Sequence, residues 1–466
     1  MKIRRLFCVT CALLCAAVML AAPLSVSADG YSLPEDVTLT AKSAVVLYVD
    51  ASVSGAEAIE RGADALLYEK DADARVAPGA LNRLALGLAA MSIIQRKGID
   101  MNTATGKYTY SLQSSHVWGT GLVTANMSIG ETWTVRDLLA VSMIQTAADA
   151  SAVLAYTLGG SVQLFVDEMN RVAAELGCDN THFTNVNGAD DPEQYTSARD
   201  AYKMLRRAMD HPELEAMMSA TEHTVTPVSG GRESSWPNTN SLLRASSDYY
   251  YSPAVLGKTG ASGVDGYSLA SFASADGYRY IVVVCGSPQK GSHYTDVAAL
   301  SRWAFRNFSY KTIIPAGQPV TRIGVDLAWN TDSINVVAKH ALSCLVISDL
   351  DENTVTKKIT LYEDAQNADG NLTAPVEKNA VVGKVELFIR TDQKIGEVEL
   401  VTAESVKRSE LLYVLASLGA FFSSPWFWLG VGLLVVLVAA YAILLYRYNH
   451  KSTRRNKRSK KYKSLK

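Results

Sequence analysis

Cysteine and histidine are scarce in this chain, with six and seven residues among 466. Three cysteines lie in the first 28 residues, and the other three, Cys178, Cys285 and Cys344, are widely spaced. An odd, scattered set excludes both a framework of paired disulfides and the close spacing of a zinc site. No two histidines stand four residues apart, as a helical metal motif requires. We therefore predict no metal site and no cofactor.

Net charge is also nearly absent, but the charges are unevenly distributed. The formal net charge of −1 combines 45 basic and 46 acidic residues. The first 28 residues contribute three of the basic residues and residues 447–466 contribute ten, and neither segment contains an acid. Residues 29–446 therefore hold 32 basic against 46 acidic residues, a net of about −14. Such an acidic region argues against nucleic acid as a partner and is typical of a soluble surface.

The two ends of the chain carry targeting and membrane signals. Basic residues precede an apolar run at 6–22 and a small-residue site at 26–28, which predicts a secretory signal peptide over residues 1–28. An uncleaved anchor is the alternative. Residues 426–446 are apolar for about 21 residues, enough to cross a ~30 Å hydrocarbon core. Because the tail at 447–466 is basic, we expect it to be cytoplasmic and the rest of a single-pass cell-membrane protein to be extracellular.

Hydrophobic patterns between the ends predict two domains. Residues 38–310 alternate strand-like runs with helical repeats, which indicates an α/β domain with a sheet flanked by helices. Residues 313–403 contain only strand signals and predict a small all-β domain. Residues 404–422 predict an amphipathic stalk, which lies either in the membrane interface or in solvent as a plain helix. In the first domain we expect strands at 43–49, 64–68 and 278–285, and helices that begin at Pro78, Thr134 and Ser161.

One tripeptide, Lys258-Thr259-Gly260, stands in an informative context. It follows Trp236-Pro237-Asn238-Thr239-Asn240 and precedes the block at 266–273. With the blocks at 130–139, 160–170 and 176–188, these residues resemble the serine D-alanyl-D-alanine carboxypeptidases. These are the low-molecular-mass, penicillin-binding protein 5-like enzymes that trim the stem peptide of peptidoglycan. The resemblance covers roughly residues 40–403. It implies a penicillin-binding, serine β-lactamase-like transpeptidase domain, a β-rich domain and a membrane anchor.

The resemblance also implies three catalytic elements, and two of them depart from the family pattern. Where the family has Pro-Ala-Ser-x-x-Lys, this chain has Ala80 at the nucleophile position and Arg83 at the base position. The family's Ser-x-Asn falls at Thr146 and Ala148. An alanine has no nucleophilic group, and a guanidinium is a poor proton acceptor. Only Lys258-Thr259-Gly260, which binds the substrate carboxylate in the family, is intact.

Other serines are weak candidates for a replacement nucleophile. Ser287 begins the one further Ser-x-x-Lys of the folded region, but Pro288 and Gly291 predict a loop there instead of a helical turn. Ser262 and Ser142 have no neighbouring base in the sequence, and we interpret them as a loop serine and a helix-surface serine.

These observations favour a catalytically inactive homologue, a pseudoenzyme that binds peptidoglycan stem peptides or wall-synthesis proteins. In this hypothesis Lys258 and Thr259 hold a carboxylate, although retention for packing alone is equally compatible with the sequence. Arg83 either reinforces that binding or fills the space of the lost serine. Two alternatives stay open: an active D-alanyl-D-alanine carboxypeptidase with a non-standard nucleophile, and a structural or assembly protein with an empty cleft.

Overall fold

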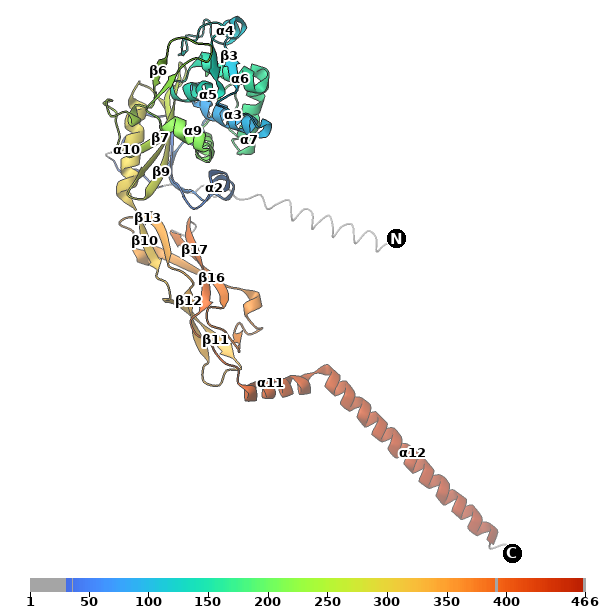
Figure 1. Cartoon of the computed structure of the whole chain (residues 1–466). Helices are drawn as coiled ribbons and strands as arrows, with labels where there is room; N and C mark the ends of the chain where they lie inside the picture. Colours follow the sequence, from blue (N-terminus) through green and yellow to red (C-terminus); the bar gives the residue numbers. More distant parts are fainter. Residues whose placement is uncertain (1–30, 36, 390–392, 464–466) are drawn as a thin grey trace. The chain divides into compact units, whose positions relative to one another are not determined.

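The computed structural model describes residues 31–35, 37–389 and 393–463. The chain divides into two compact units, Met1–Phe308 and Ser309–Lys466 (Figure 1). The expected signal peptide, residues 1–28, lies outside the described residues.

A five-stranded antiparallel sheet is the framework of the first unit. Its order is β2 (Ala65–Lys70), β1 (Ser43–Tyr48), β9 (Tyr278–Ser287), β8 (Gly266–Ala275) and β7 (Ala254–Ser262). The strands expected at 43–49, 64–68 and 278–285 are all present. The tripeptide 258–260 lies on β7, which is an edge strand, so one side of β7 has no neighbouring strand in this sheet.

Helices α5, α6, α7 and α8 pack around the central helix α3, whereas α10 packs on β8 and β9 of the sheet (Figure 1). Eleven of the 15 residues of α3 are buried, as expected of a helix that is enclosed on most sides. The helices are α2 (Gly55–Arg61), α3 (Arg83–Lys97), α4 (Tyr110–His116), α5 (Val135–Ile144), α6 (Ala148–Gly159), α7 (Val162–Glu175), α8 (Ala198–Ala208), α9 (Pro212–Ser219) and α10 (Ser292–Asn307). Two short strand pairs accompany them: β3 (Thr105–Lys107) with β4 (Thr132–Thr134), and β5 (Glu222–Val225) with β6 (Ser234–Pro237).

Two of the three expected helix starts are confirmed by their caps. The hydroxyl of Thr134 accepts the Asp137 N–H at 3.1 Å, and that of Ser161 accepts the Leu164 N–H at 3.1 Å. The expected α-helical start at Pro78 is wrong by one turn. Gly79 has a φ of 48°, which a right-handed α-helix does not accommodate. Residues Gly79–Asn82 instead form the 3₁₀ turn η1, and the α-helix begins at Arg83.

The second unit contains an all-β domain with its own core, as the strand pattern predicted. Its six-stranded sheet has the order β14 (Val355–Leu361), β16 (Val381–Ile389), β17 (Gln393–Thr402), β12 (Ser333–Ala338), β11 (Pro319–Asp326) and β15 (Leu372–Thr373). A separate pair joins β10 (Phe308–Ile314) to β13 (Leu342–Ile347). The fold class predicted from the sequence is therefore confirmed.

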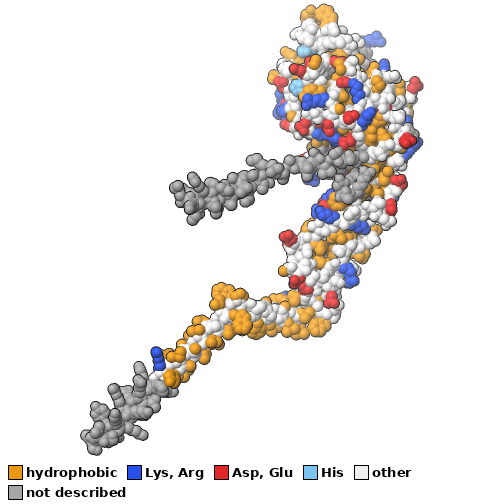
Figure 2. Space-filling view, turned by 180° about the vertical axis from the view of Figure 1, so that it is seen from behind, with side chains coloured by type: hydrophobic (Ala, Val, Ile, Leu, Met, Phe, Trp, Pro, Cys, Tyr) orange, Lys and Arg blue, Asp and Glu red, His pale blue; other side chains and the backbone are white. Residues whose placement is uncertain are grey.

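Two helices end the described chain, α11 (Glu410–Ser423) and α12 (Pro425–Lys463). The segment Pro425–Tyr448 has a mean hydropathy of 2.6 and is long and apolar enough to cross a membrane. Hydrophobic side chains cover this part of α12 (Figure 2), and none of it is buried in the protein. Helix α11 is also apolar, with Glu410 as its one charged residue.

Candidate functional site

The turn that contains Ala80 packs directly on the edge strand β7. A Cβ atom added at Gly260 would lie 2.7 Å from the carbonyl oxygen of Pro78, and one added at Gly79 would lie 2.0 Å from that of Ala261. These separations are far below normal contact, so only glycines allow the two backbones to approach this closely. Ala80 is half-buried in this turn and presents a methyl group, which cannot act as a nucleophile.

Arg83 is completely buried and joins several loops of the site. Its guanidinium donates hydrogen bonds to Asn82 Oδ1 (2.6 Å) and to the carbonyl oxygens of Val186 (2.6 Å), Asn187 (3.0 Å) and Thr146 (3.0 Å). Only the Nε–H has no partner among the described residues. Burial lowers the pKa of Arg83 to about 9, so the side chain stays charged at neutral pH. Nearly all its donors are thus engaged by the protein itself.

Thr146 lies where α5 ends and α6 begins, in a left-handed conformation. Its φ of 66° is unusual for a β-branched residue and indicates local backbone strain. Ala148 is the first residue of α6 and is buried, and its N–H donates to the carbonyl oxygen of Val123 at 2.8 Å. The next residue, Asp149, accepts the N–H groups of the same loop, as described below. The alanine side chain at 148 offers no hydrogen-bonding group to the site.

Lys258 is a second buried cation of this region. Its side chain is 1% exposed, and Nζ has no hydrogen-bond partner in the part of the chain that the structure describes. Burial and, secondarily, the charge of Arg83 hold the pKa of Lys258 well below the ordinary value for lysine. Neither cation forms an ion pair with a carboxylate anywhere in the described chain. A ligand carboxylate would supply the missing counter-charge.

Thr259 connects β7 to the end of α5 through Thr239. The two threonine hydroxyl oxygens are 2.7 Å apart, and Thr239 donates to the carbonyl oxygen of Ile144 from both its N–H (3.0 Å) and its hydroxyl (3.1 Å). Ile144 ends α5, two residues before Thr146. Together with the Arg83–Thr146 hydrogen bond, this link brings the three predicted elements into one site: 80–83, 146–148 and 258–260.

Sequence reasoning missed residues that hold these elements in place. Asp265, in the turn after β7, accepts the N–H of Ala77 at 2.7 Å and binds Lys42 Nζ at 2.7 Å. Asn187 positions Arg83 through its carbonyl oxygen, and its side chain donates to His116 O at 2.6 Å. Nothing in the local sequence indicates these contacts, because their partners lie at least 70 residues away. Thr239, by contrast, lies in a block that the sequence had singled out.

The alternative serines have structural roles. Ser287 ends β9, is buried, and donates to Asp296 Oδ2 at 3.2 Å; residues 288–290 are non-helical, as predicted. Ser262 accepts the N–H groups of Val264 and Asp265 in a turn, so it is a loop serine. The interpretation of Ser142 as a surface residue is wrong. Its side of α5 packs into the core, and its hydroxyl donates to Leu138 O at 2.7 Å.

The cysteines and acidic residues do not add a reactive or metal-binding group to the site. Cys178, Cys285 and Cys344 are free and buried. Burial raises the pKa of Cys285 to about 12, which disfavours the nucleophilic thiolate. Within residues 31–35, 37–389 and 393–463, no group of three His, Cys, Asp or Glu side chains could hold a metal ion.

Comparisons with known proteins agree with this architecture. Residues 40–289 match the family model described as D-alanyl-D-alanine carboxypeptidase, and residues 308–408 match penicillin-binding protein 5, C-terminal domain. The chain is 26% identical to D-alanyl-D-alanine carboxypeptidase DacF of Bacillus subtilis (strain 168), over 75% of this chain and 85% of that protein. It is 29% identical to D-alanyl-D-alanine carboxypeptidase DacC of Escherichia coli (strain K12), over 78% and 83%.

Solved structures show the same fold. The D-alanyl-D-alanine carboxypeptidase DacD from Francisella tularensis is similar with a TM-score of 0.60 and 22% identity, over 82% of this chain and 97% of that one. Penicillin-binding protein 5 from Haemophilus influenzae is similar with a TM-score of 0.57 and 24% identity, over 81% and 100%. At these identities the structural likeness shows the fold alone.

Proposed function

Because the chain belongs to the D-alanyl-D-alanine carboxypeptidase family, we propose that it is a catalytically inactive member that binds the carboxylate end of a peptidoglycan stem peptide. The observation that carries the binding part is the buried Nζ of Lys258, which has no hydrogen-bond partner within the described residues. A buried charge is costly unless it is paired. The carboxylate of a ligand would pair with it and favour the charged form of the lysine.

The loss of catalysis follows from the chemistry of three side chains. By the resemblance to the family motifs, Ala80 stands in place of the nucleophile, Arg83 in place of the base and Ala148 in place of the asparagine. Members of a catalytic unit act together, so the loss of one already costs many decades of rate. The guanidinium of Arg83 donates four hydrogen bonds to the protein, which supports a structural role in the space near Ala80.

The hydroxyl pair Thr239–Thr259 and the glycine at 260 would complete the carboxylate site. Thr259 is also buried, with 8% of the residue exposed. A hydroxyl and an ammonium group on one edge strand are suitable donors for a carboxylate. The apolar segment Pro425–Tyr448 would hold the protein in the membrane, and the basic composition of residues 447–466 supports a location of the binding domain on the outer face. Wall-synthesis proteins are further possible partners there.

An active carboxypeptidase with a different nucleophile is the second candidate. One observation favours it: the Thr239 and Thr259 hydroxyl oxygens are 2.7 Å apart, and Thr259 directly follows the lysine whose pKa is lowered. A neutral lysine can serve as a general base. However, Lys258 Nζ has no hydrogen-bond partner among the described residues, so it is not within reach of either hydroxyl.

A combined binding and activity assay tests the proposal. The full-length protein in detergent is titrated with acetyl-Ala-D-Ala-D-Ala, and free D-alanine is measured in the same samples. We expect binding without release of D-alanine, and at least tenfold weaker binding by Lys258→Met. Lys290→Met, in a loop after β9, is the control and leaves binding unchanged. Release of D-alanine would overturn the inactive assignment, and equal affinity in Lys258→Met would overturn the carboxylate site.

A further inference from the structure

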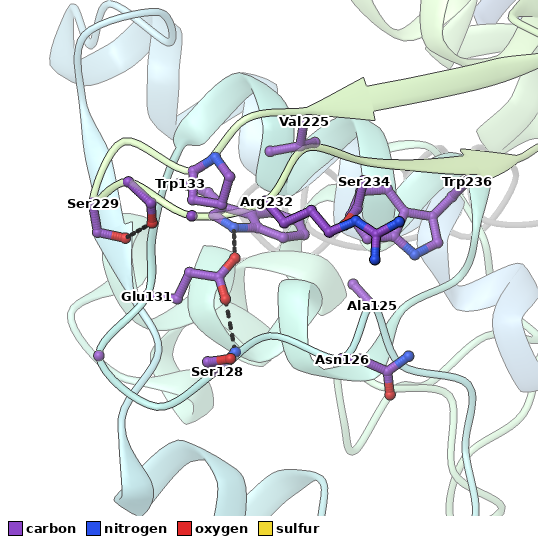
Figure 3. A pocket seen from close by; sticks show the side chains of 14 residues that line it. Ala125, Asn126, Ser128, Glu131, Trp133, Val225, Ser229, Arg232, Ser234 and Trp236 are labelled. Atoms are coloured by element: carbon purple, nitrogen blue, oxygen red, sulfur yellow. Dashed lines mark hydrogen bonds between the residues drawn. The ribbon is translucent and has the colours of Figure 1, made fainter.

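A cavity lies between the loop 125–131 and the β5–β6 hairpin (Figure 3). Its volume is about 350 Å³, which is adequate for one or two amino-acid residues. The aromatic rings of Trp133 and Trp236, with centroids 5.4 Å apart, form part of its wall. Polar side chains also line the cavity, among them those of Asn126, Ser128, Glu131, Arg232 and Ser234.

Both walls of this cavity are continuous with the candidate site. On one side, Asp149 accepts the N–H of Ala125 at 2.8 Å and that of Met127 at 3.0 Å, so the loop is fixed to the residue that follows Ala148. On the other side, Trp236 precedes Thr239 by three residues. Three residues of chain span at most roughly 10 Å. A peptide of about four residues could therefore reach from the Thr239–Thr259 pair to the cavity.

The cavity offers groups that suit an acidic peptide. Arg232 is exposed and forms no hydrogen bond or ion pair with any described residue. In Figure 3 its side chain runs across the pocket, and Glu131 and Asn126 lie below it in this view. Glu131 is held by the indole N–H of Trp133 (2.6 Å) and the N–H of Ser128 (2.8 Å), which fix its carboxylate in the wall. The free guanidinium can bind a carboxylate in two-point geometry, and the fixed carboxylate can accept an amide N–H.

We propose that this cavity binds an acidic side chain of the same peptide whose carboxylate end is held at Lys258 and Thr259. Arg232 pairs with the acidic group, and Glu131 accepts a neighbouring backbone N–H of the peptide. This inference rests on the proposed function, because the peptide must already occupy the candidate site. It assigns the recognition of an internal acidic residue to a cavity lined by residues other than Lys258 and Thr259.

Four peptides separate the two sites. The parent is acetyl-Glu-Ala-D-Ala-D-Ala; the others replace Glu by Gln, or the terminal carboxylate by an amide, or both. Binding to the full-length protein in detergent is measured by titration calorimetry. We expect the Glu peptide to bind about two- to fivefold more tightly than the Gln peptide, the range of an exposed ion pair. Arg232→Gln should abolish this preference, and Arg322→Gln, an exposed arginine on β11, should preserve it.

The outcomes distinguish this inference from the proposed function. Equal binding of the Glu and Gln peptides by the unaltered protein, or a preference that survives Arg232→Gln, would overturn the acidic pocket. Equal binding of the acid and amide forms would overturn the terminal-carboxylate site but not a Glu preference that depends on Arg232. Absence of binding by all four peptides would overturn both. Because Arg232 is exposed, its replacement should leave the fold intact, which the melting temperature checks.

Discussion

The guanidinium of Arg83 donates a 3.0 Å hydrogen bond to the carbonyl oxygen of Thr146. This contact joins the start of α3 to the strained junction between α5 and α6. The sequence predicts a departure from the family's catalytic pattern at both places. The same side chain also binds two carbonyl oxygens of the 186–187 loop. We infer that Arg83 replaces a catalytic group by a structural one, which ties together the loops around the altered centre.

Arg83→Lys should destabilise the protein, although it keeps the charge. A lysine ammonium has three donors and cannot reach the four acceptors that the guanidinium fork binds. Unsatisfied buried carbonyl groups cost about 1–3 kcal/mol each, so we expect a loss of roughly 2–4 kcal/mol in the free energy of unfolding. Urea unfolding of both proteins measures it. Arg96→Lys, at an exposed ion pair, is the control; a loss no larger in Arg83→Lys than in the control would contradict the structural role.

Gly79→Ala should be more harmful than an ordinary glycine substitution in a left-handed turn. Gly62 has a φ of 61° and open space around a Cβ position, so Gly62→Ala reports the backbone effect alone, about 1–2 kcal/mol. At Gly79 the added Cβ would also meet Ala261 O at 2.0 Å. Overpacking adds about 1–3 kcal/mol. Equal losses for the two variants in thermal unfolding would show that η1 and β7 are not in direct contact.

Lys258→Met should flatten the dependence of stability on pH. The lowered pKa in the folded state means that the unfolded chain binds more protons between that pKa and the ordinary lysine value. Stability should therefore rise with pH across this window, by up to about 1.4 kcal/mol per pH unit. Methionine removes the titration and should raise stability most at the acidic end of the window. A slope identical in the variant and the parent would show that Lys258 is not buried as a free amine.

Glu168→Gln should remove a contribution to folding stability that is present at neutral pH and is lost in acid. The pKa of Glu168 is lowered to about 2, mainly by hydrogen bonds from Arg171. Burial partly opposes this effect, and further hydrogen bonds from Ser92 and Arg96 add to it. Its contribution is present above the ordinary glutamate pKa near 4.5 and is lost as the pH falls from there toward 2. At neutral pH we expect a loss of roughly 2 kcal/mol in Glu168→Gln. Unfolding curves that show no difference between the two proteins at pH 7 would refute this network.

The sequence predicted elements better than it predicted their contacts. The β-branched runs at β1 and β9 were recognised, but their antiparallel register, with Val45 opposite Val283, depends on the tertiary fold. Caps at Thr134 and Ser161 were correct because the capping hydroxyl acts within three residues. The start of α3 was wrong because the conformation of Gly79 follows from its contact with β7.

For the candidate site too, the sequence predicted which segments contribute but not the contacts between them. The tripeptide 258–260 and positions 80, 83, 146 and 148 were predicted from their sequence context, and the structure links these segments through Arg83 and Thr239. Their roles stay predictions. Sequence alone left open whether Arg83 serves binding or fills space, because its four acceptors come from three separate segments. The burial of Lys258 and the cavity at Arg232 likewise depend on residues that are distant in the sequence.

The central claim is that no acyl-enzyme can form at Ala80. The most direct test incubates the full-length protein in detergent with a fluorescent penicillin and reads the intact mass. The combined variant Ala80→Ser, Arg83→Lys and Ala148→Asn is treated in parallel, and an adduct on it would show that the scaffold still accepts the ligand. We predict no covalent adduct on the unaltered protein. A stoichiometric adduct of one penicillin per unaltered chain would contradict the account and show that another residue acts as the nucleophile.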